Sequence, residues 1–275
     1  MNTSINQQFW RQCWIAVLFC GAFLAGCKSS TSTSESGGGL LSGIMSKGGC
    51  YNAYYPATAT LKKTYKTTFA GSSMPPSTHT ETFSNVTAEG FSQKMEFAPS
   101  EVKTAAGGNL GNTERMMVEH RFKCQPDGLA AVEFVNMALG NQMNVKYKTL
   151  NVNGLSFPKE SDWQVGKKWQ IAFQIESEAA MGAMKEAMKM LSKGTITMDC
   201  EIVGQESVTV PAGTFEAFKV NININNKLKA NIGGREMPMN NDIKTTSWFA
   251  KDAGVVKSSY EGMGGAGTEL IALTK

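Results

Sequence analysis

The stretch FKVNININNKLKANI, residues 218–232, decides the fold class. Apolar side chains alternate with lysines and asparagines along its first half, and the alternation returns in phase after a short break. Because successive side chains of a β-strand point to opposite faces, this period predicts a long strand with one apolar face and one wet face. Such strands are typical of an antiparallel sheet that packs on one side and meets water on the other.

The same two-residue period recurs along most of the chain after residue 50. It is found in the stretches MMVEHRFKC, MNVKYKTLNV, WQIAFQIES, TITMDCEIV, TSWFA, GVVKSSY and TELIALT. Turn signals such as PDG, NG, PAG and GG separate these stretches. The pattern predicts a single, mainly β domain over residues 50–275, built as a curled antiparallel sheet or half-barrel.

One segment departs from this period. Residues 176–194, ESEAAMGAMKEAMKMLSKG, are rich in Ala, Met, Lys and Glu and end at a glycine. Their larger apolar residues fall on one helical face, at positions i, i+3, i+7 and i+10. These residues are Met181, Met184, Met188 and Leu191. We expect one amphipathic helix over residues 176–192, packed across the sheet.

The first 26 residues have the character of a secretory signal. Arg11 precedes a short apolar run at 13–26, which falls below the roughly 20 apolar residues that a spanning helix needs. The ending LAGC, residues 24–27, resembles the bacterial lipobox, in which cleavage precedes a cysteine whose thiol carries a diacylglycerol. A further acyl chain, such as palmitate, on the new amino terminus supplies the second signal that stable anchoring requires. We expect residues 1–26 to be a lipoprotein signal peptide and Cys27 to be lipidated, with an ordinary signal peptide as the alternative.

A polar segment follows the cysteine. Residues 28–39 are almost all Ser, Thr and Gly, a composition that behaves as a flexible tether. We therefore assign residues 27–49 to the lipidated cysteine and its linker. Lys28, and not Asp, follows the cysteine, which favours the periplasmic face of the outer membrane if the source is Gram-negative.

Three cysteines lie beyond the linker: Cys50, Cys124 and Cys200. An exported protein meets an oxidising compartment, so one disulfide and one free thiol are expected. Cys200 falls on the apolar face of a predicted strand, as a buried free thiol does. We favour a bond between Cys50 and Cys124, and the other pairings stay open.

Several spaced pieces of the domain resemble one known family. They are CYNAYYP (50–56), GQESVTVPAGTFEAFKV (204–220), TSWFAKDAGVVKSSY (246–260) and TELIAL (268–273). In this order they resemble the TapB family of exported bacterial proteins, an uncharacterised envelope domain, over most of residues 50–275. The first strand departs from the usual pattern, because LKKTY stands where the family has G-x-x-W. The resemblance implies an envelope location and brings no catalytic residues.

No constellation of residues points to catalysis or to a metal. The formal net charge is only +4, without a clustered basic stripe, so we expect no nucleic-acid partner. Of the two histidines, His79 is predicted in a polar loop and His120 on the inner face of a strand. Neither has companions at zinc-ligand spacing, and no nucleophile elbow occurs. We therefore expect a protein that is not an enzyme and needs no cofactor.

Three roles remain open for a membrane-anchored envelope lipoprotein. In the first, Met181, Met184, Met188 and Leu191 line a gap between helix and sheet that holds lipid tails or another apolar ligand. In the second, the domain is a structural or assembly module that binds another envelope protein through a sheet edge or the helix face. In the third, the methionines bind Cu(I), which we favour less because helical spacing already accounts for them.

Overall fold

The computed structural model describes residues 50–69, 76–99, 101–103, 109–112, 116–134, 137–139, 143–181, 189–232, 234–261 and 266–275. Strands make up nearly all of these residues, and the one short helical element is the 3-10 turn η1 (Glu160–Asp162). Within the described ranges, no helix is long and apolar enough to cross a membrane. The strands are β1 (Lys62–Phe69), β2 (Ser77–Ser84), β3 (Gly90–Phe97), β4 (Glu101–Lys103), β5 (Asn109–Asn112), β6 (Met116–Gln125), β7 (Gly128–Phe134), β8 (Met137–Leu139), β9 (Met143–Gly154), β10 (Phe157–Pro158), β11 (Lys168–Met181), β12 (Lys189–Val210), β13 (Gly213–Ile232), β14 (Arg235–Ala250), β15 (Gly254–Tyr260) and β16 (Ala266–Thr274).

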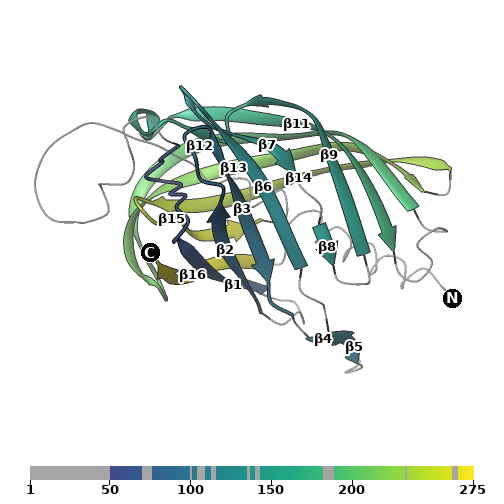
Figure 1. Ribbon diagram of the computed structural model, residues 1–275, viewed down its shortest axis with the longest axis horizontal. Coiled ribbons are helices and arrows are strands. Elements are labelled where there is room, and N and C mark those ends of the chain that lie inside the picture. The colour runs from purple at the N-terminus through teal and green to yellow at the C-terminus, as the bar shows by residue number, and fades with distance from the viewer. Residues whose placement is uncertain are drawn as a thin grey trace, which may run out of the picture.

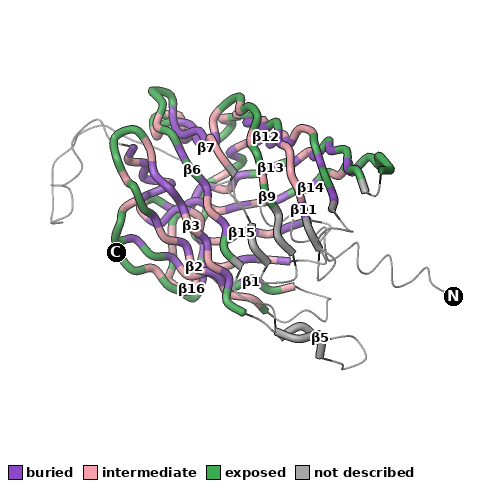
Figure 2. The backbone as a smooth tube through the Cα atoms, turned by 45° about the vertical axis from the view of Figure 1, so that its right-hand side comes forward, coloured by how far each residue is buried: buried purple, intermediate pink, exposed green. Residues whose placement is uncertain are grey.

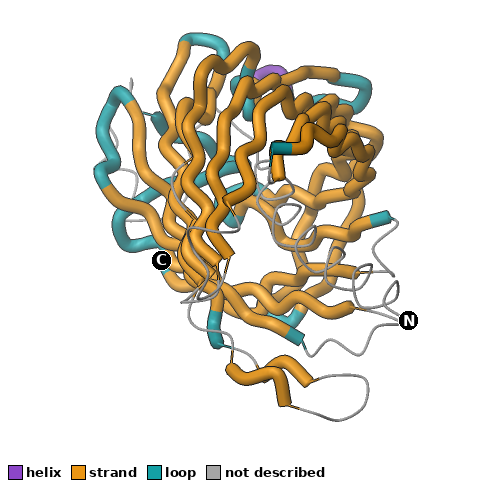
Figure 3. Tube along the Cα trace, turned by 90° about the vertical axis from the view of Figure 1, so that its right-hand side faces the viewer, coloured by secondary structure: helices purple, strands orange, loops and turns teal. Residues whose placement is uncertain are grey.

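Fourteen of these strands form one antiparallel sheet, in the order β10-β7-β6-β3-β2-β1-β16-β15-β14-β13-β12-β11-β9-β8. The remaining two, β4 and β5, pair with each other. The large sheet curls, so that its strands surround a central region when viewed end-on (Figure 3). The sheet is not closed along its length, although β8 also pairs with β6 at two residue pairs. The expectation of a mainly β, curled antiparallel sheet is confirmed.

The long hairpins β11–β12 and β13–β14 form the broad back of the sheet (Figure 1). Residues 218–232 belong to β13, whose pairing with β12 runs from Val210↔Gly213 to Met190↔Ile232. Burial alternates along it as predicted, because Ile222 and Ile224 are buried and Asn223 is exposed. The same alternation of buried and exposed backbone runs through the neighbouring strands (Figure 2). The sheet therefore has an inner, core-forming face and an outer, wet face.

The prediction of an amphipathic helix over residues 176–192 is wrong, because the described residues of this range lie in strands. Residues up to Met181 continue β11, and residues from Lys189 begin β12; residues 182–188 lie outside the described part. The two strands pair from Lys168↔Glu201 to Ala180↔Lys189, and β9 pairs with the other edge of β11. Helix propensity differs among these residue types by only about half a kcal/mol each, so pairing along both edges outweighs it.

The N-terminal segment 50–61 fills one end of the curled sheet. Tyr55 is buried, and its ring lies 4.5 Å from that of Phe157 and 5.4 Å from that of Phe122, centroid to centroid. The ring of the preceding Tyr54 stacks on Trp163 at 4.6 Å. These spacings are those of packed aromatic pairs. The segment is therefore part of the core and not an appendage to it.

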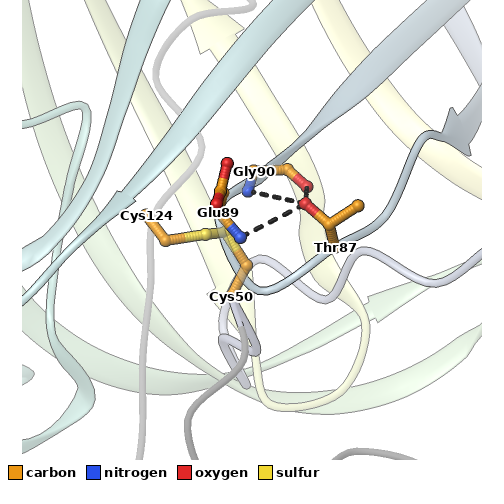
Figure 4. Close-up of a disulfide and its surroundings, with 5 residues drawn as sticks. All are labelled: Cys50, Thr87, Glu89, Gly90 and Cys124. Carbon is orange, nitrogen blue, oxygen red and sulfur yellow. Dashed lines mark hydrogen bonds between the residues drawn. A yellow bond between two sulfur atoms is a disulfide. The ribbon is translucent and has the colours of Figure 1, made fainter.

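A disulfide fastens this segment to the sheet. Cys50 is bonded to Cys124 of β6, with the two Cα atoms 5.3 Å apart, and Cys200 is buried and free. The cysteine pair is the one favoured from the sequence. The turn between β2 and β3 lies beside the bond, where the Thr87 side chain accepts hydrogen bonds from the backbone N–H groups of Glu89 and Gly90 (Figure 4). The bond closes a loop across 74 positions of the chain.

We expect removal of the disulfide to destabilise the domain strongly. In a Cys50→Ser/Cys124→Ser variant, the free energy of unfolding should fall by about 2–4 kcal/mol, because the unfolded chain regains the freedom of a long loop. Urea unfolding, followed by tryptophan fluorescence, measures this change. A Cys200→Ala variant keeps the bond and is the control. Equal stability of the double variant and the parent would show that the bond does not hold the segment in place.

Candidate functional site

Among the described residues, five charged, imidazole or amide side chains are buried on the inner face of β1, β2, β3 and β6, and we call them the inner polar cluster. They are Lys63, His79, Glu81, Gln93 and His120. The Nζ atom of Lys63 lies 3.1 Å from Oε2 of Glu81, and both side chains are almost fully buried. The same ammonium group lies 5.3 Å from the ring centroid of Tyr55 and 5.1 Å from that of Phe83. A buried cation of this kind is held by its carboxylate and by aromatic faces in place of water.

Gly254 makes room for this ion pair. Its φ of 77° lies in the left-handed region, as expected for the glycine of the KDAG turn. A Cβ atom at this position would lie 3.1 Å from Nζ of Lys63 and 3.5 Å from the carbonyl oxygen of Tyr54. The turn between β14 and β15 therefore closes over the buried lysine, and the N-terminal segment lies against it.

His79 lies in β2, so the prediction that it lies in a polar loop is wrong. Its ring stacks between those of Tyr65 and Phe97, with centroids 4.9 Å away on either side. His120 is fully buried on the inner face of β6, as predicted, directly opposite Gln93 of β3. The polar sequence STHTET suggested a loop, whereas its alternate residues face the interior of the sheet.

Both histidines are held in the neutral form. Burial, assisted by the nearby Lys63 ammonium, lowers the pKa of His79 to about 3. Burial alone lowers the pKa of His120 to about 4. Because imidazolium loses its hydration on burial, neither ring can act as a cation near neutral pH. Within the described part of the chain, no group of three or more His, Cys, Asp or Glu side chains could hold a metal ion. The inner polar cluster is thus a component of the core.

Two adjoining hollows lie on the outer face of the sheet. The first has a volume of about 670 Å³ and lies across β9, β11, β12, β13 and β14. Charged side chains on neighbouring strands form ion pairs in this hollow. Oε1 of Glu176 lies 2.7 Å from Nζ of Lys193, and its Oε2 lies 3.9 Å from Nζ of Lys148. Its lining is Lys146, Tyr147, Lys148, Glu176, Ser177, Glu178, Leu191, Ser192, Lys193, Lys229, Asn231 and Glu236.

The second hollow, of about 430 Å³, continues the first along β12, β13 and β14. Lys193 and Lys229 line both, so the two hollows form one surface, which we call the outer groove. Asparagines dominate the rest of the second hollow, and the side chain of Asn226 donates a 2.7 Å hydrogen bond to that of Asn241. Its lining is Lys193, Gly194, Asn225, Asn226, Lys227, Leu228, Lys229, Pro238, Asn240, Asn241 and Asp242.

The residues proposed from the sequence as an apolar site do not form one. Without the helix, no gap between helix and sheet exists in the described part of the chain. Met184 and Met188 lie outside the described residues, and Met181 ends β11 with its side chain undescribed. Leu191 is 52% exposed and lines the first hollow of the outer groove. Cys27 also lies outside the described residues.

These features define a β protein built on one large curled sheet, with its N-terminal segment packed into the core and bonded to the sheet by a disulfide. Residues 77–265 match the DUF3108-like family, and the chain belongs to that family. The match does not confirm the resemblance to the TapB family. No curated protein matches the chain.

Two solved structures are similar to this chain, each at 13% sequence identity. One is an inferred exported protein with a YmcC-like fold from Bacteroides fragilis; the TM-score is 0.39, over 80% of this chain and 98% of that one. The other is an inferred lipoprotein from Parabacteroides distasonis, with a TM-score of 0.42 over 81% of this chain and 99% of that one.

We expect a Lys63→Met substitution to cost about 3–5 kcal/mol of unfolding free energy, because it leaves Glu81 as an uncompensated buried charge. Adding Glu81→Leu should restore much of this loss. The half-buried Lys94–Glu96 pair, 2.9 Å apart, is the matched control, and Lys94→Met should cost about 1 kcal/mol or less. Urea unfolding of the parent and of these three variants provides the measurement. Equal costs at the two lysines would contradict the burial of the first pair.

We expect stability to fall with acidification below about pH 6.5. The two histidines of the chain bind protons at about pH 6.5 when unfolded, but only near pH 3 to 4 when folded. The unfolded state therefore binds more protons between these limits, and each histidine should remove about 2 kcal/mol between pH 7 and pH 5. Urea unfolding at both pH values measures the loss, and His120→Gln should reduce it by about half. The same loss in parent and variant would refute the neutral, buried state of His120.

Proposed function

We propose that this protein is a lipid-anchored module of the bacterial cell envelope that acts by binding and not by catalysis. The lipobox-like ending at Cys27 and the polar linker after it support the anchor. The disulfide supports export to an oxidising compartment. Lys28 favours the outer membrane, at its periplasmic face, if the source is Gram-negative.

The single observation that carries the binding role is the position of the outer groove. The inner face of the described sheet is filled by its own side chains and by the N-terminal segment, as the complete burial of Tyr55, Met95, Phe157 and Phe173 indicates. An apolar ligand held inside would have to displace that core. The outer groove, in contrast, is open and lies across hydrogen-bonded strands of the large sheet. Recognition of another envelope component, the assembly role considered from the sequence, therefore fits the outer face best.

Catalysis has no support in the described geometry. The buried histidines are neutral and inaccessible, and the thiol of Cys200 is buried, with its pKa raised by burial and by the nearby Asp199. A nucleophile or general base needs both access and a matched pKa. In the outer groove, Glu176 and Glu236 are paired with lysines across the strands, and the carboxylate of Asp242 accepts a hydrogen bond from Asn225.

One experiment tests the anchor and the binding face together. A photo-cross-linking residue at Asn240, which lines the second hollow, should give a cross-linked envelope component in the membrane fraction. With Cys27→Ser added, the protein should move to the soluble fraction, because it lacks its acyl chains, and the product should be lost. The same residue at Lys66, on the exposed face of β1, is the control. Membrane retention of the Cys27→Ser variant would overturn the anchor, and equal products from both positions would overturn the binding face.

A further inference from the structure

The turn between η1 and β11 presents an apolar side chain to solvent. Residues 164–167 form a β-turn, closed by a 3.1 Å hydrogen bond from the N–H of Lys167 to the carbonyl oxygen of Gln164. Gly166 has a φ of 91°, as the third position of a type II turn requires. Val165, at the second position, is 58% exposed, the highest value among the large apolar side chains of the described residues. A Cβ atom on Gly166 would have no neighbour within 4 Å, so the turn stands clear of the domain.

A second exposed valine lies beside this turn. The N–H of Gly166 donates a 2.7 Å hydrogen bond to the carbonyl oxygen of Ile202 in β12, and the N–H of Ile202 donates one of 3.0 Å to that of Lys167. Val165 precedes Gly166, and Val203, which is 38% exposed, follows Ile202. The backbone hydrogen bonds therefore hold both valines at one tip of the domain, which we call the valine tip.

The chain enters the domain at the same end of the sheet. Cys50, the first described residue, is fastened to β6 by the disulfide. Four residues later, the ring of Tyr54 stacks at 4.6 Å on that of Trp163, which directly precedes the turn. Residues 28–49 link Cys50 to Cys27, and Ser/Gly-rich chains of that length have an end-to-end distance of about 25 Å. An anchor at Cys27 therefore keeps the valine tip near the bilayer.

The aromatic residues at this end suit the interface between a membrane and water. Tyr51, Tyr54 and Trp169 are all half-buried. The Tyr51 hydroxyl donates a hydrogen bond to the Asp252 carboxylate, and the Trp169 indole N–H donates one of 3.0 Å to the carbonyl oxygen of Ser156. Aromatic side chains with an apolar body and a polar tip are enriched at membrane interfaces.

The charged side chains near the valine tip are paired with one another. Four lysines at this end each have a carboxylate oxygen within 4.0 Å. The pairs are Lys159–Asp127, Lys167–Asp162, Lys168–Glu201 and Lys251–Glu160. A contact made here therefore depends on the burial of apolar side chains and only weakly on salt.

Resting on the proposed lipid anchor, we infer that the domain contacts the membrane through the valine tip. Val165 and Val203 enter the interfacial region of the phospholipid bilayer. Two valines bind a membrane only weakly by themselves, but a short flexible linker raises their effective concentration at its surface. The outer groove then lies away from the bilayer, because Glu176 is eight residues along β11 from Lys168, a distance of about 25 Å in a strand. The membrane contact thus leaves the outer groove free for another envelope component.

The test uses the mature, lipid-anchored protein in vesicles of phosphatidylethanolamine and phosphatidylglycerol. A fluorophore is attached to a Gln164→Cys variant in a Cys200→Ala background, and a phospholipid with a nitroxide on its acyl chain is the quencher. We expect quenching of this probe, and Val165→Asp/Val203→Asp should reduce the quenched fraction by about tenfold, because charges replace both apolar side chains. An increase in ionic strength from about 0.1 to 1 M, which shortens the screening length from about 10 to 3 Å, should leave the quenching unchanged.

Met117→Asp/Leu150→Asp is the matched control, because these side chains of β6 and β9 are exposed to similar extents, 43% and 40%. Met117 lies seven residues along β6 from Cys124, about 23 Å in a strand, so this variant should be quenched like the parent. Urea unfolding ensures that each variant is folded. Equal quenching in the parent and the valine variant, or loss of quenching at high salt, would overturn the inference.

Sedimentation of the same vesicles separates the inference from the proposed function. Protein that sediments with the vesicles while its probe at position 164 is not quenched would overturn the inference alone and leave the anchor standing. Protein that does not sediment with the vesicles would overturn the anchor and the inference with it.

Discussion

The structure depends on the packing of its N-terminal segment, residues 50–61, inside the curled sheet. Tyr55 packs among the rings of β3, β6 and β10. The buried Lys63 ammonium lies against the rings of Tyr55 and Phe83 and forms an ion pair with Glu81. The backbone N–H of Asp252 donates a 2.6 Å hydrogen bond to the carbonyl oxygen of Ala53, and the Tyr51 hydroxyl donates to the Asp252 carboxylate. The disulfide to β6 then prevents the segment from leaving. Strands far apart in the sequence thus meet at one short stretch of chain.

The packing of the N-terminal segment inside the sheet has a consequence for function. A curled sheet with an open interior would suit an apolar ligand, but the described interior is occupied by its own residues. Under the proposed function, recognition falls to the outer face, where the long hairpins β11–β12 and β13–β14 carry mainly polar side chains at alternate positions. Those side chains are ordered by the strand register and not by contacts with the core. These side chains can therefore contact a ligand without disturbing the packing of the core.

Much of the fold could be predicted from the sequence, because period two is directly visible where apolar and polar residues alternate strongly, as in residues 218–232. The prediction failed over residues 176–192, where Ala, Met, Lys and Glu satisfy both a helical face and a strand, and only pairing with β9 and β13 decides between them. It failed again for His79, because its strand places polar side chains on the inner face.

The candidate site was harder to predict than the fold. The lysines of β12 and β13 are visible in the sequence as a wet face, but their opposition depends on a register that links residue 193 to residue 229. The burial of Lys63 has no sequence signal either, since its neighbours Lys62 and Lys66 are exposed. Both features arise from long-range pairing, which the local pattern does not encode.

Native mass spectrometry of the lipid-anchored protein, purified from the envelope fraction, tests the central claim most directly. The claim is that the described interior is filled by the protein's own side chains and that recognition occurs on the outer face. The account predicts a mass that corresponds to the protein and its covalent acyl chains, without a lipid that denaturation releases. One releasable lipid per protein, retained when Lys193, Lys227 and Lys229 of the outer groove are replaced by glutamine, would contradict it, because such a lipid would have to occupy the interior.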